Sequence, residues 1–259
     1  MKQFVLQVHG QPVTRAARII SWCLVALLAA ALFTFAFSQL HYGWEWNAIW
    51  QYRQKFLQGW LMTVAISASS LLVSLLIGLI TALARRASFL PLRYGATLYV
   101  ETARGTPLLV QILILFYVVA NAFGIENRYL VGVLTLSLFA GAYLAEMIRS
   151  GIESIRDSQL ESARAIGLTR RQTYRYVIFP QVVRQLIPPL TGQFASIIKD
   201  SSLLSIIAVS EFTLNAQEVN AFTYSTLESY LPLAVGYLLL TLPISLISRF
   251  LERKFYYAT

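Results

Sequence analysis

The sequence predicts an all-α protein that crosses a membrane several times. Of its 259 residues, 57% are hydrophobic and only 13% are charged, whereas soluble domains carry about 25% charged residues. The apolar residues also gather in runs of about twenty, the length that a helix needs to cross the hydrocarbon core. A chain of this composition leaves no room for a large soluble domain.

Six apolar runs predict six membrane-spanning helices, each bounded by charged or turn-forming residues. The runs are 19–38, 57–83, 97–120, 130–148, 185–209 and 231–250. Arg15 and Arg18 precede the first run, as basic residues precede a signal peptide's apolar region. The length of the run and the lack of a small-x-small cleavage site favour an uncleaved helix. Aromatic residues at 44–52 predict a short interfacial helix before the second span.

The basic residues set the predicted orientation. With the N-terminus in the cytoplasm, the predicted cytoplasmic segments hold 16 of the 21 lysine and arginine residues. This membrane asymmetry accounts for the net charge of +9, so we predict lipid but no nucleic acid as a partner. The predicted parts are an N-terminal segment with the first helix at 1–56, a membrane domain at 57–250 and a cytoplasmic tail at 251–259.

One long polar stretch, residues 150–184, predicts two short helices hinged at a glycine. Ser158 and Glu161 have the spacing of a capping box, and so do Thr169 and Gln172. In this pattern a hydroxyl and a carboxyl or amide group bond the free backbone N–H groups at a helix start. The stretch is therefore predicted to be an ordered cytoplasmic structure.

Gly167 is placed to end the first of these helices, and Pro180 to end the second. Ala163 and Gly167 give the first helix a small apolar face, which predicts docking against a partner. The many arginines of the stretch leave an alternative open, in which it rests on anionic lipid headgroups.

The same stretch resembles the cytoplasmic EAA loop of ABC importer permeases, which is seated in a groove of an ATPase subunit. Positions 162, 177 and 179 depart from the usual alanine, isoleucine and leucine. Apart from this resemblance, Glu161 would serve simply as a capping residue. The residues that the resemblance assigns to ATPase coupling are Glu161, Ser162, Ala163, Gly167 and Pro180.

Three further motifs resemble the polar amino-acid permeases of type I ABC importers, the histidine, glutamine and arginine type, over about residues 58–254. They are RGTPLLVQ at 104–111, KDSSL at 199–203 and NAQE at 215–218. The resemblance implies a five-helix permease core that pairs with a second permease subunit. It also implies two ATPase subunits, a periplasmic amino-acid-binding protein and the bacterial inner membrane.

The chain itself is not predicted to be an enzyme. It contains no Gly-Lys pair and therefore no phosphate-binding loop of the G-x-x-x-x-G-K-[ST] type. ATP and Mg are accordingly assigned to the partner ATPase, and no cofactor is assigned to this chain. The lone cysteine, Cys23, and two distant histidines exclude an internal disulfide and a Cys/His zinc site.

Four ionisable residues inside the predicted spans are functional candidates, because each costs about 2.5–3.5 kcal/mol to insert. A carboxylate would accept hydrogen bonds from the ammonium group of an amino acid, and a guanidinium or hydroxyl group would donate to its carboxylate. Gly105 and Pro107 predict a broken helix that lines a cavity. The predicted substrate-binding set is Glu101, Arg104, Thr106, Lys199, Asp200, Ser201 and Ser202.

A structural role for the same charges is the alternative. Glu101 and Arg104 would pair with each other at i and i+3, and Lys199 and Asp200 would stabilise the interface of two permease subunits. The polar stretch at 211–229 is predicted to be an external loop suited to a binding protein.

Taken together, the sequence predicts the permease subunit of an ATP-driven importer that moves a polar or charged amino acid by alternating access. Two other functions remain open. A proton-coupled secondary transporter would use the buried carboxylates as a proton relay, and a non-transporting scaffold would use the loop to hold an ATPase.

Overall fold

The computed structural model describes residues 15–39 and 42–256, which are helical apart from short connections. Their internal contacts divide the chain into two units, 1–44 and 45–259. In the first unit, α2 (Arg15–Ser38) exposes its apolar side chains on all sides, and of its described residues only Ala17 is buried. A helix that is apolar all round suits a lipid environment. The domain boundary predicted at residue 56 remains a prediction.

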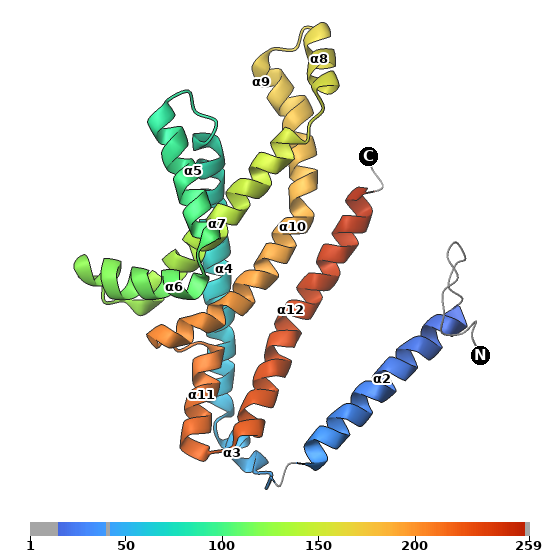
Figure 1. Cartoon of the computed structure of the whole chain (residues 1–259), viewed down its shortest axis with the longest axis vertical. Coiled ribbons are helices and arrows are strands. Elements are labelled where there is room, and N and C mark those ends of the chain that lie inside the picture. Colours follow the sequence, from blue (N-terminus) through green and yellow to red (C-terminus); the bar gives the residue numbers. More distant parts are fainter. Residues whose placement is uncertain (1–14, 40–41, 257–259) are drawn as a thin grey trace. The chain divides into compact units, whose positions relative to one another are not determined.

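The second unit is built around two long helices, α4 (Arg53–Ala84) and α7 (Arg128–Glu153), which pack along each other (Figure 1). Small residues allow the two backbones to come close, as in other membrane helix pairs. A Cβ atom built on Gly78 of α4 would lie 2.7 Å from Cβ of Leu144, and one on Gly141 of α7 would lie 2.7 Å from Ile77. The predicted short helix before α4 is confirmed as α3 (Trp46–Gln51).

Helix α5 (Leu90–Gly105) lies against α7 and ends at a sharp bend. The chain turns by 113° and continues as α6 (Leu108–Leu113) and the π-helix η1 (Ile114–Ala120) (Figure 1). The predicted break of this helix is therefore confirmed.

The last part of the unit begins with the loop elements and ends with two packed helices. Helix α10 packs against α12, and the shorter α11 contacts both α4 and α12. Left-handed residues, Ala208 and Tyr224, precede and follow α11. The elements are α8 (Asp157–Ala165), α9 (Arg170–Thr173), the π-helix η2 (Tyr174–Ile178), α10 (Phe179–Asp200), the 3-10 helix η3 (Ser201–Ile207), α11 (Phe212–Thr223) and α12 (Thr226–Tyr256).

Five of the six predicted spans have a counterpart that is long and apolar enough to cross a membrane. Within the described residues these are α2, α4, α7 and α12, with the bent pair of α5 and α6–η1 as the fifth. Helix α10 is not among them because it mixes polar residues such as Gln185 and Gln193 with its apolar ones. The count of six is thus not confirmed.

Two details predicted for the polar loop are wrong. Helix α8 starts two residues early, at Asp157, so Ser158 lies inside its first turn and Arg156 takes the N-cap position without a side-chain cap. Pro180 does not end a helix, because the π-helix η2 leads directly into α10. The proline lies in the first turn of α10, where it is tolerated. The second capping box, between Thr169 and Gln172, is confirmed.

The stretch at 211–229 is not an open loop as predicted. Most of it is α11 and the start of α12, and several of its polar side chains turn inward: Glu211, Asn215 and Glu228 are all buried. Glu211 caps α11 by accepting hydrogen bonds from the backbone N–H groups of Thr213 and Leu214, both at 2.8 Å.

Candidate functional site

The bend between α5 and α6 is held by one side chain, Gln111. Thr106 and Pro107 have extended backbone, so the last carbonyls of α5 lose their helical partners. The side-chain amide nitrogen of Gln111 lies 2.8 Å from the carbonyl oxygen of Ala103, 3.1 Å from that of Thr106 and 2.8 Å from the Thr106 hydroxyl. Gln111 therefore bonds two of the backbone carbonyls at the break, those of Ala103 and Thr106.

This geometry decides what the Thr106 hydroxyl can offer to a ligand. Its proton is donated to the carbonyl oxygen of Thr102 at 2.8 Å, and its oxygen accepts from Gln111. The hydroxyl can accept one more hydrogen bond but has no proton to give. Thr106 can therefore contact an ammonium group but not donate to a carboxylate.

Replacing Gln111 with methionine is expected to remove about 2 kcal/mol of stability, because two backbone carbonyls at the break lose their donor. The measurement is the apparent Tm of the purified protein in detergent. The matched control is Gln217→Met at an exposed position of α11, which should leave Tm unchanged. Equal Tm values for the two variants would contradict the bridging role of Gln111.

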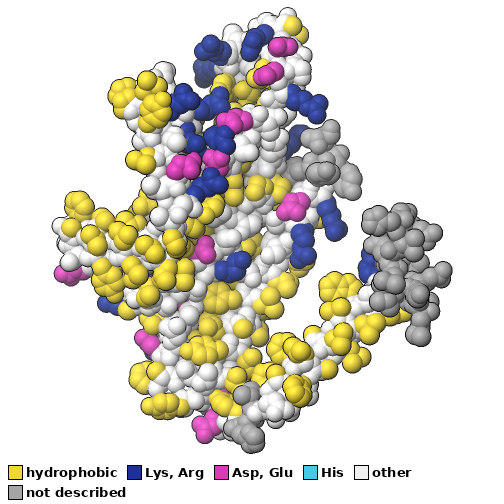
Figure 2. All heavy atoms as spheres, viewed as in Figure 1, with side chains coloured by type: hydrophobic (Ala, Val, Ile, Leu, Met, Phe, Trp, Pro, Cys, Tyr) yellow, Lys and Arg dark blue, Asp and Glu magenta, His cyan; other side chains and the backbone are white. Residues whose placement is uncertain are grey.

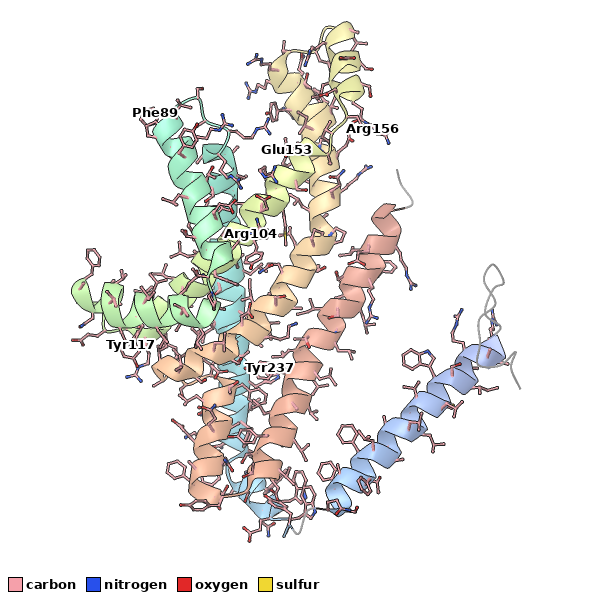
Figure 3. The ribbon with its side chains drawn as sticks, in the orientation of Figure 1. Phe89, Arg104, Tyr117, Glu153, Arg156 and Tyr237 are labelled. Atoms are coloured by element: carbon pink, nitrogen blue, oxygen red, sulfur yellow. The ribbon has the colours of Figure 1, made fainter. Side chains whose placement is uncertain are left out.

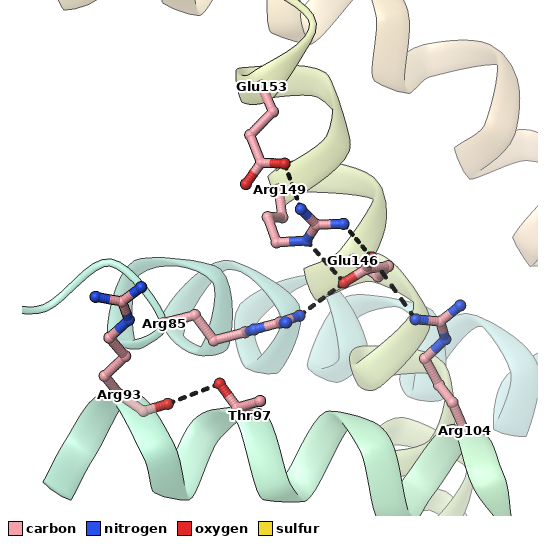
Figure 4. Close-up of polar contacts among 7 residues, drawn as sticks. All are labelled: Arg85, Arg93, Thr97, Arg104, Glu146, Arg149 and Glu153. Atoms are coloured by element: carbon pink, nitrogen blue, oxygen red, sulfur yellow. Dashed lines mark hydrogen bonds and ion pairs between the residues drawn. The ribbon is translucent and has the colours of Figure 1, made fainter. Parts of the chain in front are cut away.

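A cluster of charged side chains lies where α4, α5 and α7 meet (Figure 4). Its centre is Glu146 of α7, which accepts a hydrogen bond from Arg85 at 2.6 Å and forms a two-pronged pair with Arg149. Arg149 also pairs with Glu153. Arg104, near the end of α5, lies further out, with its Nη1 atom 3.8 Å from Glu146 Oε1 (Figure 3).

The second predicted polar group lies where α10 passes into η3. Ser201 is buried and donates its hydroxyl proton to the carbonyl oxygen of Ile198 at 2.8 Å, and Ser202 donates to that of Lys199 at 2.7 Å. Both serine protons are therefore used within the helix. Lys199 is exposed and Asp200 is half-buried.

The bend and η3 meet through their apolar residues. Leu108, just after the bend, and Leu204 of η3 share a buried cluster with Leu136 of α7. Within the described part of the chain, no hydrogen bond or ion pair joins Glu101, Arg104 or Thr106 to the polar groups at 199–202. The structure brings the two motifs to a common core without joining their polar groups directly.

The polar loop forms a compact hairpin of helices between the end of α7 and the start of α10. Gly167 ends α8 with a φ of +78°, as predicted. Leu160 of α8 packs on a buried cluster of Ile155, Ile178 and Val182, which fixes the hairpin to α10. Of the predicted coupling residues, Ala163 is buried, and Glu161, Ser162, Gly167 and Pro180 are exposed.

Comparison with known proteins identifies the family to which this chain belongs. The profile of the family described as binding-protein-dependent transport system inner membrane component matches residues 74–256. The chain belongs to this family. The permease is 37% identical to the glutamine transport system permease protein GlnP of Escherichia coli (strain K12) over 212 residues, which are 81% of this chain and 97% of GlnP.

Two further comparisons agree. The L-cystine transport system permease protein TcyB of Bacillus subtilis (strain 168) is 38% identical over 212 residues, 81% of this chain and 90% of TcyB. The crystal structure of an amino acid ABC transporter with histidines contains a chain with a TM-score of 0.77 and 32% identity, covering 82% of this chain and 100% of that one. The permease is thus a subunit of an amino-acid ABC importer, and ATP hydrolysis is carried out by a partner subunit.

The predicted pairing of Glu101 with Arg104 is wrong. Arg104 of the permease forms its ion pair with Glu146 of α7, and Glu101 is exposed. Because α5 lies beside α7, a carboxylate from another helix reaches Arg104.

The sequence prediction missed Glu146, Arg85 and Gln111. Glu146 falls inside the predicted span 130–148. The cost of placing an ionisable side chain inside a membrane therefore made it a functional candidate, like the other intramembrane charges. Arg85 was counted only as a cytoplasmic charge, and its partner lies 61 residues away. Gln111 was part of a recognised motif, but its role depends on the direction in which the chain bends.

Proposed function

We propose that this permease moves a polar amino acid from a periplasmic binding protein across the bacterial inner membrane by alternating access. L-Glutamine is the first candidate substrate and L-cystine the second, because GlnP is named as a glutamine permease and TcyB as an L-cystine permease. The observation that carries the proposal is Arg104 beside the broken helix: its side chain is 37% exposed, and its guanidinium makes no hydrogen bond to the described residues.

The binding chemistry follows from which groups are still free. The hydroxyl protons of Thr106, Ser201 and Ser202 are used within the fold, so the substrate carboxylate is assigned to Arg104 and Lys199. Glu101 and Asp200 are assigned to the substrate ammonium group, and Thr106 adds an acceptor. This division refines the predicted set, in which Thr106 and Ser201 were donors.

The hairpin at 150–184 is assigned to ATPase coupling. Glu161, Ser162, Gly167 and Pro180 are exposed on it, and Ala163 lines a shallow groove of about 350 Å³ with Ile166 and other residues. ATP and Mg would be bound by two partner ATPase subunits, and a second permease subunit, identical or different, would complete the pathway. This chain is assigned no cofactor of its own.

The orientation proposed has both termini in the cytoplasm. Basic side chains gather at the end of the second unit that carries the hairpin (Figure 2), as the positive-inside rule expects of a cytoplasmic face. The apolar side chains seen around α6 and η1 would then face lipid or the second permease subunit.

The test is purification of the tagged permease from its native host in mild detergent, with mass-spectrometric identification of bound proteins. We expect an ATPase with a phosphate-binding loop to remain bound, and Glu161→Lys to reduce its recovery at least about tenfold, a loss of about 1.4 kcal/mol in docking. Asp157→Lys is the matched control, because it makes the same charge change at another exposed residue of α8.

The outcomes separate the alternatives. Recovery of the folded wild-type chain alone would favour the secondary transporter. Recovery of the ATPase without ATP-dependent amino-acid uptake would favour the scaffold. Equal ATPase recovery with Glu161→Lys and with wild type would contradict the coupling role of Glu161.

A further inference from the structure

Glu146 has both of its carboxylate oxygens occupied by two arginines. Oε2 accepts from Arg85 at 2.6 Å and from Nε of Arg149 at 3.0 Å, and Oε1 accepts from Nη2 of Arg149. The two bonds from Arg149 form the side-by-side pair that gives arginine and carboxylate their strongest contact. Glu146 is therefore held in place without any help from Arg104.

Arg104 is the third and loosest arginine of this cluster. Its Nη1 atom lies 3.8 Å from Glu146 Oε1, within reach of charge attraction but beyond a hydrogen bond. Its guanidinium carbon lies 5.4 Å from the centre of the Tyr143 ring, a second weak attraction. Both contacts direct Arg104 toward α7, and neither uses up its N–H donors.

The charges of the cluster do not balance. Among the residues that the structure describes, Arg85, Arg104 and Arg149 form ion pairs only with Glu146 and Glu153, which leaves one positive charge. Arg85 is 14% exposed and bonded, and Arg149 pairs with both carboxylates, so Arg104 is the group with capacity for another anion. One monoanionic carboxylate would neutralise the cluster.

Free space lies next to Glu146. A cavity of about 390 Å³ between α7 and α10 is lined by Glu146, Ser150 and Gln185 and extends to Ser154, at the start of the hairpin. This volume is within the range of small-molecule sites, about 300–1,000 Å³. A ligand that leaves Arg104 would have room on the hairpin side of Glu146.

We propose that Glu146 is a positioning residue that competes with the substrate's carboxylate for Arg104. Without substrate, Arg104 pairs with Glu146. When an amino acid arrives, Arg104 moves to its carboxylate, and Glu146 keeps Arg85 and Arg149. Return of Arg104 to Glu146 then assists release of the substrate toward the cavity. The inference rests on the proposed function, in which Arg104 binds the carboxylate.

The test is a double-mutant cycle in the permease–ATPase complex purified from the native host. Two quantities are measured for L-[³H]glutamine: the Kd of the complex without binding protein, and kcat of uptake by proteoliposomes with binding protein. Glu146→Gln is expected to lower Kd by about threefold or more, in the range of coupling between neighbours, and to lower kcat because release slows. In an Arg104→Gln background, Glu146→Gln should leave Kd unchanged.

The control is Glu153→Gln, which removes the other carboxylate of Arg149 and has no contact with Arg104. It should leave Kd unchanged. If Glu146→Gln does not fold, Glu146→Asp replaces it, since it keeps the charge but draws it back from Arg104, and the same directions are expected.

The proposal is overturned if the Glu146 variant shifts Kd equally with and without Arg104, if Glu153→Gln shifts it as much, or if neither Kd nor kcat changes. A wild-type complex that takes up neither glutamine nor cystine would instead contradict the proposed function. Normal wild-type uptake without coupling between positions 104 and 146 would contradict this inference alone.

Discussion

Replacing Glu211 with leucine is expected to lower the free energy of unfolding of the permease by about 4 kcal/mol, because several buried hydrogen-bond donors lose their acceptor. Glu211 is fully buried and accepts hydrogen bonds from two backbone N–H groups of α11 and, at 3.0 Å, from the hydroxyl of Tyr237. Leucine fills the space but leaves these three donors unsatisfied. The apparent Tm in detergent should fall by about 10 °C.

Glu211→Gln is the matched control, because it keeps the shape and one acceptor. Burial raises the pKa of the Glu211 carboxyl, and the backbone N–H groups of Thr213 and Leu214 act against this rise. A group whose pKa is raised by folding stabilises the fold at low pH, and this contribution is lost as pH rises through the raised pKa.

The wild-type Tm should therefore fall as the pH rises from the ordinary pKa of a glutamate through the raised pKa of Glu211, and the Glu211→Gln variant should lack this part of the fall. Equal Tm losses for the leucine and glutamine variants at every pH would contradict the capping role.

Local chemistry in the sequence was enough to predict the broken helix. Pro107 lacks an N–H group and Gly105 has no side chain, so the break follows from covalent structure. The role of Gln111 does not follow, because its amide reaches Ala103 only after the chain has turned by 113°. The sequence predicted where the helix breaks but not what holds the break.

Polar residues were predicted best where the chain meets water. Thr169 and Gln172 form their capping box within four residues, so the pattern is complete in the sequence. Glu211 and Asn215 were assigned to a wet loop, because a buried polar group and an exposed one look alike in composition. Asn215 donates to the carbonyl oxygen of Lys55, 160 residues away, and such partners are set by packing alone.

The charged cluster shows the same limit. Arg104 was predicted as a functional residue from its depth in a span, and its nearest carboxylate was sought on its own helix. The structure supplies that carboxylate from α7, because α4, α5 and α7 meet at Glu146. Single-helix spacing finds the candidates, and only tertiary packing decides which of them pair.

Replacing Gly78 with valine is expected to lower the free energy of unfolding by about 3 kcal/mol, at the upper end of the usual range for overpacked positions. A Cβ atom at this position would lie 2.7 Å from Cβ of Leu144, 3.2 Å from the backbone nitrogen of Ala145 and 3.2 Å from the carbonyl oxygen of Gly141. None of these atoms is the far end of a flexible side chain. Helices α4 and α7 would have to move apart, and α7 carries Glu146.

Gly95→Val is the matched control, because Gly95 also lies within a helix, α5, and has open space where its Cβ would be. Both substitutions put the same β-branched residue into a helix, so the difference in apparent Tm isolates the contact between α4 and α7. We expect Gly78→Val to lie about 8 °C below Gly95→Val. Equal Tm values would mean that α4 and α7 adapt without separating, and the close approach at Gly78 would then not stabilise the fold.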